Sequence, residues 1–278
     1  MYEKCSKFHP DKIADRISGA VVDLCYTKSK NPKVACEVLI GHKECNIQVE
    51  TSEQIAFGEV ENIVRRIAGD VKLNLLVVPQ DKHLADNQKE GIRAADNGIF
   101  KGCPVTREQS ALAYIAHRLY ERFPADGKFI LNGKKLIICQ SNATNTEIKS
   151  LLEPIIANEE IEDVVINPLG EWTGGIDVDS GATNRKLGSD MGDAVTGGGL
   201  MGKDISKADV SVNIMCYILA QQYQREVTAF CAIGDKEVTF TIDGNEYTKP
   251  YELVTRKAKE YIDNLGGFEK FAELGLIR

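Results

Sequence analysis

The order of predicted secondary structure repeats along the chain, and this repeat limits the fold more than any other feature. Apolar side chains recur at helical spacing from Pro10 to Tyr26, and similar helical patterns begin at Thr106 and Ser206. Two predicted strands, a second helix and a further strand follow the first of these helices, and we expect the same order in each repeat. A spacing of about one hundred residues is too long for a solenoid. The repeat therefore predicts three similar modules, each with two helices over one face of a small sheet.

Short local signals mark the limits of these elements. Thr106-x-x-Gln109 is a capping box at a helix start, and Asn132-Gly133 is a strong hairpin turn. Ser206-x-x-Asp209 is a variant of the capping box and predicts the start of the third repeat. The predicted helices cover 10–26, 59–68, 145–158, 206–223 and 250–265, with another from 106, and the predicted strands cover 34–40, 46–51, 74–78, 129–131, 135–140, 164–166, 227–233 and 238–242.

The predicted fold class is α+β, with three pseudo-symmetric α/β modules, each a small mixed sheet covered by helices. The approximate boundaries are 1–85 for an N-terminal module, 86–170 for a central module and 171–278 for a C-terminal module. The terminal segments of these modules are free to interleave.

Charge and cysteine content exclude several classes of protein. The 278 residues have a net charge of −7, whereas nonspecific nucleic-acid binding needs clustered basic charge, so no nucleic-acid partner is predicted. The longest apolar run, 214–220, is too short to cross a membrane, and the sequence predicts no secretory signal. Eight Cys without a C-x-x-C pair predict buried, reduced thiols in a cytoplasmic protein rather than a zinc or disulfide site.

Three segments between the predicted elements, 1–9, 79–105 and 168–205, are rich in Gly, Asp, Asn and Lys. We expect them to hold the chemistry, because functional residues concentrate in loops on rigid scaffolds. Within the third segment, 197–204 reads GGGLMGKD, which resembles part of a phosphate-binding loop with Lys203 as its cation. No apolar strand precedes it and Asp204 replaces the Mg²⁺-binding hydroxyl, which favours a phosphate site or a plain glycine turn over a P-loop fold.

Several charged residues have both a structural and a functional interpretation. His9 and Asp11 flank Pro10 at a predicted helix start, where His9 would be a weak cap and Asp11 an ordinary first-turn carboxylate. Asp209 belongs to the predicted capping box. Glu37 is the one charge in an apolar strand, where it faces solvent or needs a cation.

The segment around Asp179 has the same two interpretations. Carboxylates followed by the pair Arg185-Lys186 suit a metal ion beside an anionic ligand, although a solvated turn also fits. Trp172, the sole tryptophan, would fill a core or stack on a base.

Together these motifs resemble the S-adenosylmethionine synthetase (methionine adenosyltransferase) family, and they occur in the family's order. The matching residues are Glu3-x-x-Ser6-x-x-His9-Pro10-Asp11-Lys12-Ile13-Ala14-Asp15, Val34-Ala35-Cys36-Glu37, Glu50-Thr51, Asn87-Gln88, Asp96-Asn97-Gly98, Asp126-Gly127-Lys128, Ile166-Asn167-Pro168, Asp179-x-Gly181-x-Thr183-x-Arg185-Lys186, Gly197-Gly198-Gly199, Gly202-Lys203-Asp204 and Lys207-x-Asp209-x-Ser211. The chain departs from the family's motifs at Lys7, Phe8, Asn97, Val178, Ala182 and Asn184.

This resemblance implies the reaction of ATP, methionine and water to S-adenosylmethionine, pyrophosphate and phosphate, a step of one-carbon metabolism. The methionine sulfur would attack C5′ of ATP in line and expel tripolyphosphate, which is hydrolysed before release. The thioether is already a nucleophile, so positive groups around the departing triphosphate would supply the catalysis.

The resemblance also assigns residues to roles. Catalysis falls to His9, Asp179, Lys128, Arg185, Lys186 and Lys203. ATP binding adds Glu3, Asp126 and Trp172 to those six, with Trp172 stacking on adenine where the family has Phe. The methionine and adenosyl groups fall to Glu50, Gln88, Asp96 and Lys207. Two Mg²⁺ per site involve Asp11 and Asp209, and K⁺ involves Glu37.

The family's shared active sites imply a homodimer, which could pair further into a dimer of dimers. Between Gln88 and Asp96 the chain has room for only a short version of the family's mobile lid. Two other functions fit parts of the sequence: a non-catalytic nucleotide-binding or regulatory homologue, and a phosphate-loop ATPase or kinase.

Overall fold

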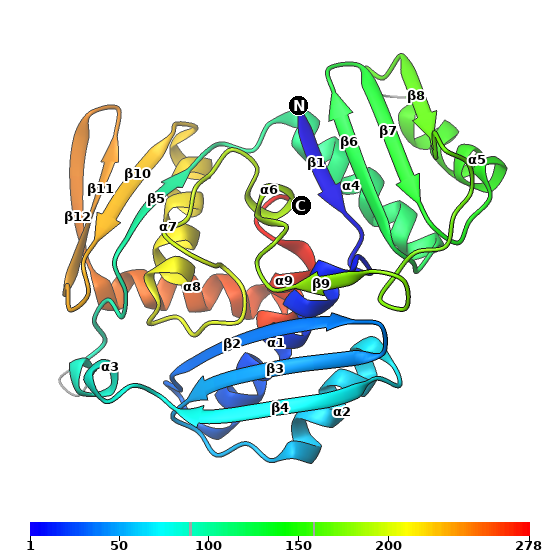
Figure 1. Ribbon diagram of the computed structural model, residues 1–278. Coiled ribbons are helices and arrows are strands. Elements are labelled where there is room, and N and C mark those ends of the chain that lie inside the picture. Colours follow the sequence, from blue (N-terminus) through cyan, green and yellow to red (C-terminus); the bar gives the residue numbers. More distant parts are fainter. Residues whose placement is uncertain (89–90, 158) are drawn as a thin grey trace.

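In the computed structural model, three four-stranded sheets lie around the packed helices α1 (Pro10–Lys28) and α9 (Phe268–Leu274) (Figure 1). The structure describes residues 1–88, 91–157 and 159–278. Part of the segment between Gln88 and Asp96, where a shortened lid is expected, lies outside the described residues. The same holds for Asn158, the last residue of a predicted helix; the structure ends that helix at Ile156.

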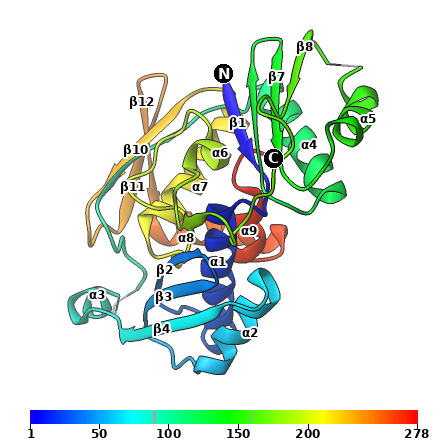
Figure 2. The same ribbon diagram turned by 45° about the vertical axis from the view of Figure 1, so that its right-hand side comes forward.

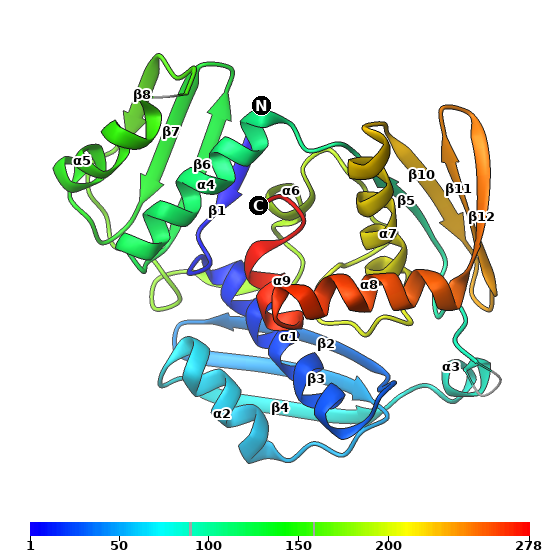
Figure 3. The same cartoon turned by 180° about the vertical axis from the view of Figure 1, so that it is seen from behind.

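The first sheet has the order β4-β3-β2-β9 and is covered on one face by two helices (Figure 3). Its elements are α1 (Pro10–Lys28), β2 (Val34–Gly41), β3 (Glu44–Thr51), α2 (Phe57–Ala68), β4 (Lys72–Pro79) and β9 (Ser180–Ala182). The side chains of β2 alternate between buried and exposed, because only one face of the sheet packs on α1. The order of elements predicted for the first repeat is thereby confirmed.

The second sheet repeats this arrangement with the order β1-β6-β7-β8. Its elements are β1 (Tyr2–Cys5), α4 (Arg107–Arg122), β6 (Gly127–Asn132), β7 (Lys135–Gln140), α5 (Asn145–Ile156) and β8 (Asp163–Ile166). The predicted capping box is present: Thr106 Oγ1 accepts from the backbone N of Gln109, and Gln109 Oε1 accepts from the backbone N of Thr106.

The third sheet, β12-β11-β10-β5, differs from the prediction. Its elements are β5 (Gly98–Gly102), α7 (Ala208–Tyr223), β10 (Val227–Cys231), β11 (Glu237–Ile242), β12 (Asn245–Pro250) and α8 (Tyr251–Leu265). The expected order of a final helix followed by a strand is wrong here, because β12 precedes α8 and pairs antiparallel with β11. The hairpin turn at Asp243 and Gly244 returns the chain directly to β11, which makes a crossover unnecessary.

Each sheet is completed by a strand from a distant part of the chain. β1 pairs with β6, β5 with β10 and β9 with β2, all antiparallel. The three segments treated as loops in the sequence therefore also provide edge strands, which interleaves the predicted modules. The boundaries at 1–85, 86–170 and 171–278 stay a prediction.

Helix α1 lies where the three lobes meet (Figure 2). It is buried on nearly all sides and packs against β2, against β9 and against α9 (Phe268–Leu274). Two short helices, α3 (Lys82–Asn87) and α6 (Leu187–Met191), lie in the segments between the modules. The N-terminal end of α1 faces α6 and β1, so residues far apart in sequence converge there.

All eight Cys are free, and six of them are buried. No helix among the described residues is long and apolar enough to cross a membrane.

Candidate active site

His9 begins helix α1 and caps it with its own side chain. Its Nδ1 accepts a hydrogen bond from the backbone N of Asp11 at 3.2 Å, which confirms the predicted capping role. Burial, and next the charge of Lys186, lower the pKa of His9 to about 4. The imidazole is therefore neutral at pH 7, and because Nδ1 is an acceptor, the proton resides on Nε2.

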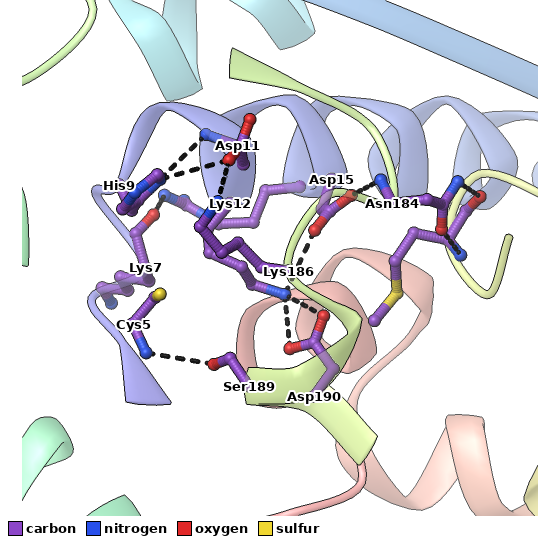
Figure 4. Close-up of polar contacts among 12 residues, drawn as sticks. Cys5, Lys7, His9, Asp11, Lys12, Asp15, Asn184, Lys186, Ser189 and Asp190 are labelled. Atoms are coloured by element: carbon purple, nitrogen blue, oxygen red, sulfur yellow. Dashed lines mark hydrogen bonds and ion pairs between the residues drawn. The ribbon is translucent and has the colours of Figure 1, made fainter. Parts of the chain in front are cut away.

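Asp11 lies in the first turn of α1, close to Lys186 (Figure 4). Its Oδ1 accepts from the backbone N of Ala182 at 2.8 Å and lies 3.6 Å from Arg185, while its Oδ2 accepts from Lys186. Burial acts to raise the pKa of Asp11, but the hydrogen bonds from Lys186 and Ala182 lower it below its usual value. The carboxylate thus holds two cations beside His9.

Lys128 on β6 approaches the same place from the second sheet. It pairs with Glu3 on the neighbouring strand β1 at 2.9 Å, and this hydrogen bond raises the pKa of Lys128. Its charge also acts on His9 and Asp11. We call His9, Asp11, Lys128, Arg185 and Lys186 the α1 group, because they collect at the N-terminus of that helix.

Asp126 borders the α1 group, and Trp172 lies close to Asp126, with both side chains against Gly174. Asp126 is buried, which raises its pKa to about 6, although the backbone N–H groups of Gly175 and Gly127 donate to it. The charge of Asp179, an exposed residue, acts on both His9 and Asp126. Trp172 is 38% exposed and donates from its indole N–H to Asn167 Oδ1 at 3.1 Å.

Lys203 and Asp209 form a second charged site, which we call the α7 group. Lys203 Nζ lies 2.7 Å from Asp209 Oδ2, and the other oxygen of this buried carboxylate has no hydrogen-bond partner. Burial raises the pKa of Asp209, and the charges of Asp96 and Lys207 also act on it.

The predicted capping box at Ser206-x-x-Asp209 is wrong. The N-cap residue of α7 is Lys207, without a side-chain cap, and Ser206 donates its backbone N–H to Asp204 instead. The Asp209 side chain turns toward Lys203 and Gly198, where a Cβ would lie 2.7 Å from its Oδ2. The Asp209 carboxylate therefore does not cap α7.

The α1 and α7 groups lie along the same edge of β2. Strand β9, next to Lys186, pairs with Leu39, whereas Lys203 forms a bridge with Ala35. Four residues of a strand span about 13 Å. Among the described residues, no hydrogen bond or ion pair joins the two groups.

The remaining predicted site residues lie outside both groups. Glu37 is exposed on β2 and accepts from the hydroxyl of Thr183. Glu50 is exposed at the end of β3. Gln88 bonds the backbone of Arg93 through both ends of its amide. Asp96 accepts from the backbone N of Asn97, and Lys207 precedes α7.

A buried network behind the α1 group was missed in the sequence. Lys12 Nζ lies 2.7 Å from Asp190 Oδ1 and 3.2 Å from Asp15 Oδ2, and Asp15 Oδ1 accepts from the backbone N of Asn184 (Figure 4). Lys4 donates to carbonyl oxygens of Ser189, Leu274 and Ile277. In the sequence, Lys12 and Asp15 appear only as members of the N-terminal motif, three residues apart on a predicted helix.

The carboxylates suit Mg²⁺ held jointly with phosphate rather than by protein alone. The described residues contain no group of three or more His, Cys, Asp or Glu placed to hold a metal ion. Magnesium usually binds through one or two carboxylates together with substrate phosphates. The unpartnered, buried oxygen of Asp209 fits that donor set, whereas Asp11 would first have to release Lys186.

Comparisons with known proteins show which proteins this chain is similar to. Residues 2–80 match the family described as S-adenosylmethionine synthetase, N-terminal domain. An S-adenosylmethionine synthase of Nitratidesulfovibrio vulgaris is 27% identical, covering 99% of this chain and 88% of that protein. One from Mycoplasma capricolum is 28% identical, covering 79% and 71%. The solved structure of an unusual S-adenosylmethionine synthetase from Campylobacter jejuni is 20% identical, with a TM-score of 0.78 over 100% of this chain and 95% of that one.

Proposed function

We propose that this chain, a short and divergent relative of the S-adenosylmethionine synthetases, is a methionine adenosyltransferase. The resemblance predicted from the sequence and the predicted α+β fold are both confirmed by the comparisons. The observation that carries the proposal is the α1 group, where a neutral imidazole lies beside three cationic side chains and a carboxylate.

The reaction needs these groups around the triphosphate, which is the leaving group. The methionine sulfur would attack C5′ of ATP with its own electron pair as the C5′–O5′ bond breaks, so S-adenosylmethionine and tripolyphosphate form together. The barrier lies in the negative charge that develops on O5′ and the triphosphate. Lys128, Arg185 and Lys186 would bind that triphosphate, which water then converts to pyrophosphate and phosphate.

His9 would stabilise the leaving oxygen. Because its Nδ1 accepts from the helix backbone, its Nε2–H is a donor in a fixed orientation. Because the pKa of His9 is lowered, the imidazole is neutral at pH 7, and it donates this hydrogen bond without giving up the proton. Asp126, Asp179, Glu3 and Trp172 would contact the nucleotide around it.

The proposed metal ions have separate positions. Asp11 and Asp209 would hold Mg²⁺, which when bound neutralises charge on the triphosphate. Glu37 would hold K⁺. Since Asp11 pairs with Lys186 and Asp209 pairs with Lys203, each lysine would move to phosphate as its carboxylate takes the metal.

We also propose that two copies of the chain complete each site. Within one chain no hydrogen bond or ion pair joins the described residues of the α1 and α7 groups, so the α7 group of a second copy would supply Lys203 to the triphosphate. The methionine and adenosyl contacts would come from Glu50, Gln88, Asp96 and Lys207. The eight free thiols support a cytoplasmic location, where cysteines stay reduced.

The test combines product analysis with direct binding. The protein is incubated with ATP, L-methionine, Mg²⁺ and K⁺, and S-adenosylmethionine, pyrophosphate and phosphate are measured by mass spectrometry and ³¹P NMR. We expect all three products. Formation of ADP would instead support an ATPase or kinase.

Trp172 gives the matching binding signal, because it is the sole tryptophan and is partly exposed. A change in its fluorescence on adding a non-hydrolysable ATP analogue reports nucleotide binding. Binding without any turnover would favour the non-catalytic homologue and overturn the proposed activity.

A further inference from the structure

We infer that Asn184 is a positioning residue that fixes the Arg185–Lys186 pair relative to the glycine segment 197–203. This inference rests on the proposed function, in which Arg185, Lys186 and Lys203 bind phosphate. It concerns a residue at which the chain departs from the related family's motif.

The backbone of Asn184 directs its two cationic neighbours. Its φ of 64° is left-handed, a conformation that Asn adopts more readily than most residues. Its backbone N–H donates to Asp15 Oδ1 at 2.8 Å, and Asp15 is completely buried in α1. The turn that leads into Arg185 and Lys186 is thereby tied to the helix that carries His9 and Asp11.

The side chain of Asn184 connects this turn to the glycine segment. Its Oδ1 accepts from the backbone N of Met201 at 2.7 Å, and its Nδ2 donates to the backbone O of Met201 at 3.2 Å. The side-chain amide of Asn184 thus binds both the N–H and the C=O of Met201, which lies two residues before Lys203.

Gly199 leaves the space that this amide occupies. A Cβ at Gly199 would lie 2.5 Å from Nδ2 and 2.7 Å from Cγ of Asn184, and these are its nearest atoms. The backbone of Gly199 is outside the left-handed region, so alanine would be excluded by Asn184 and not by the backbone. The two residues therefore form one contact that holds both phosphate-binding segments of a chain in place, so that each segment is positioned for the site it serves in the proposed dimer.

A double-mutant cycle tests this contact, with inorganic tripolyphosphate as the probe and calorimetry as the measurement. Asn184→Gly keeps the left-handed backbone but removes both bonds to Met201, and Gly199→Ala pushes the amide away. We expect each single variant to weaken tripolyphosphate binding by about tenfold, the scale of coupling between contacting residues. In the double variant the alanine has room, so we expect no further loss beyond that of Asn184→Gly.

Gln224→Gly is the matched control, since Gln224 has a φ of 52° at the C-cap of α7, at the opposite end of that helix from Asp209. It should leave binding unchanged. If Asn184 only stabilised the fold, the variants would lower the melting temperature while the folded protein bound tripolyphosphate as before. That result, or fully additive losses, would overturn the inference. A wild-type protein that does not bind tripolyphosphate would overturn the proposed function and the inference together.

Discussion

The α1 group and the α7 group contain similar residues but are assembled in different ways. The α7 pair comes from one short stretch, because Lys203 and Asp209 are six residues apart. The α1 group combines the start of α1, β6 and the segment before α6, so that Lys186 reaches Asp11 across 175 positions of sequence. One site can form from a local turn, whereas the other exists only in the complete fold.

The electrostatics of the two groups differ accordingly. In the α1 group both oxygens of Asp11 have donors, and the neighbouring histidine is held neutral. In the α7 group one oxygen of Asp209 is buried without a partner. Under the proposed function, the first group would stabilise a leaving anion, and the free oxygen of Asp209 in the second would be available to a cation.

The largest expected effect concerns the α1 group alone. Replacing His9 with alanine removes the oriented Nε2 donor, and we expect the turnover number for S-adenosylmethionine to fall by roughly 10²–10³-fold or more. Steady-state kinetics with mass-spectrometric detection measures it. His83→Ala, at an exposed position on α3, is the control and should keep full activity. Full activity in His9→Ala would remove His9 from the mechanism.

The next prediction tests whether the two groups meet across a dimer. Lys186→Met and Lys203→Met should each be nearly inactive, but a refolded mixture of the two should regain about one quarter of wild-type activity, because half of the dimers contain one intact site. Mixing Lys186→Met with Lys128→Met, which both affect the α1 group, is the control and should regain nothing. Absence of recovery in the first mixture, or an active monomer by light scattering, would show that one chain makes the whole site.

A smaller effect concerns the burial of Asp126 beside the α1 group. Its pKa is raised to about 6 in the folded protein, above the value of an exposed carboxyl, so the folded state binds the extra proton. The stability associated with this group is therefore present at low pH and is lost as pH rises through 6. Between pH 5 and pH 7, wild type should lose about 1 kcal/mol of unfolding free energy relative to Asp126→Asn. Urea denaturation at both pH values measures this, and parallel pH curves would contradict it.

The smallest expected effect concerns Trp172. Trp172→Phe keeps an aromatic ring but loses the indole hydrogen bond to Asn167, which should cost about 1 kcal/mol of stability. Nucleotide affinity measured by calorimetry should change only a few-fold, whereas Trp172→Ala should weaken it further. Equal affinities for the two variants would exclude stacking on the base.

The sequence predicted much of the fold because helix and strand periods are local. The first and second modules agree with the structure, including the capping box at Thr106. The edge strands β1, β5 and β9 were missed, because strands of three to five residues are too short to show alternation. Their existence depends on partners in another part of the chain.

The candidate site, like the fold, was predictable only in part. The charged positions were identified by resemblance to a family, and their roles stay predictions. The contacts of Lys12 with Asp190 and of Asn184 with Met201 could not be foreseen, because each joins segments whose approach is set by the packing of α1. A sequence pattern indicates which residues are charged, but not which of them form ion pairs or hydrogen bonds with one another.

The exchange of edge strands has a consequence for synthesis on the ribosome. Strand β2 ends at Gly41, but β9, which covers its open edge, begins only at Ser180. During elongation that edge stays available to a chaperone or to the same edge of a neighbouring nascent chain. We therefore expect a truncated polypeptide that stops before Ser180 to associate through β2, while the chain that includes β9 does not.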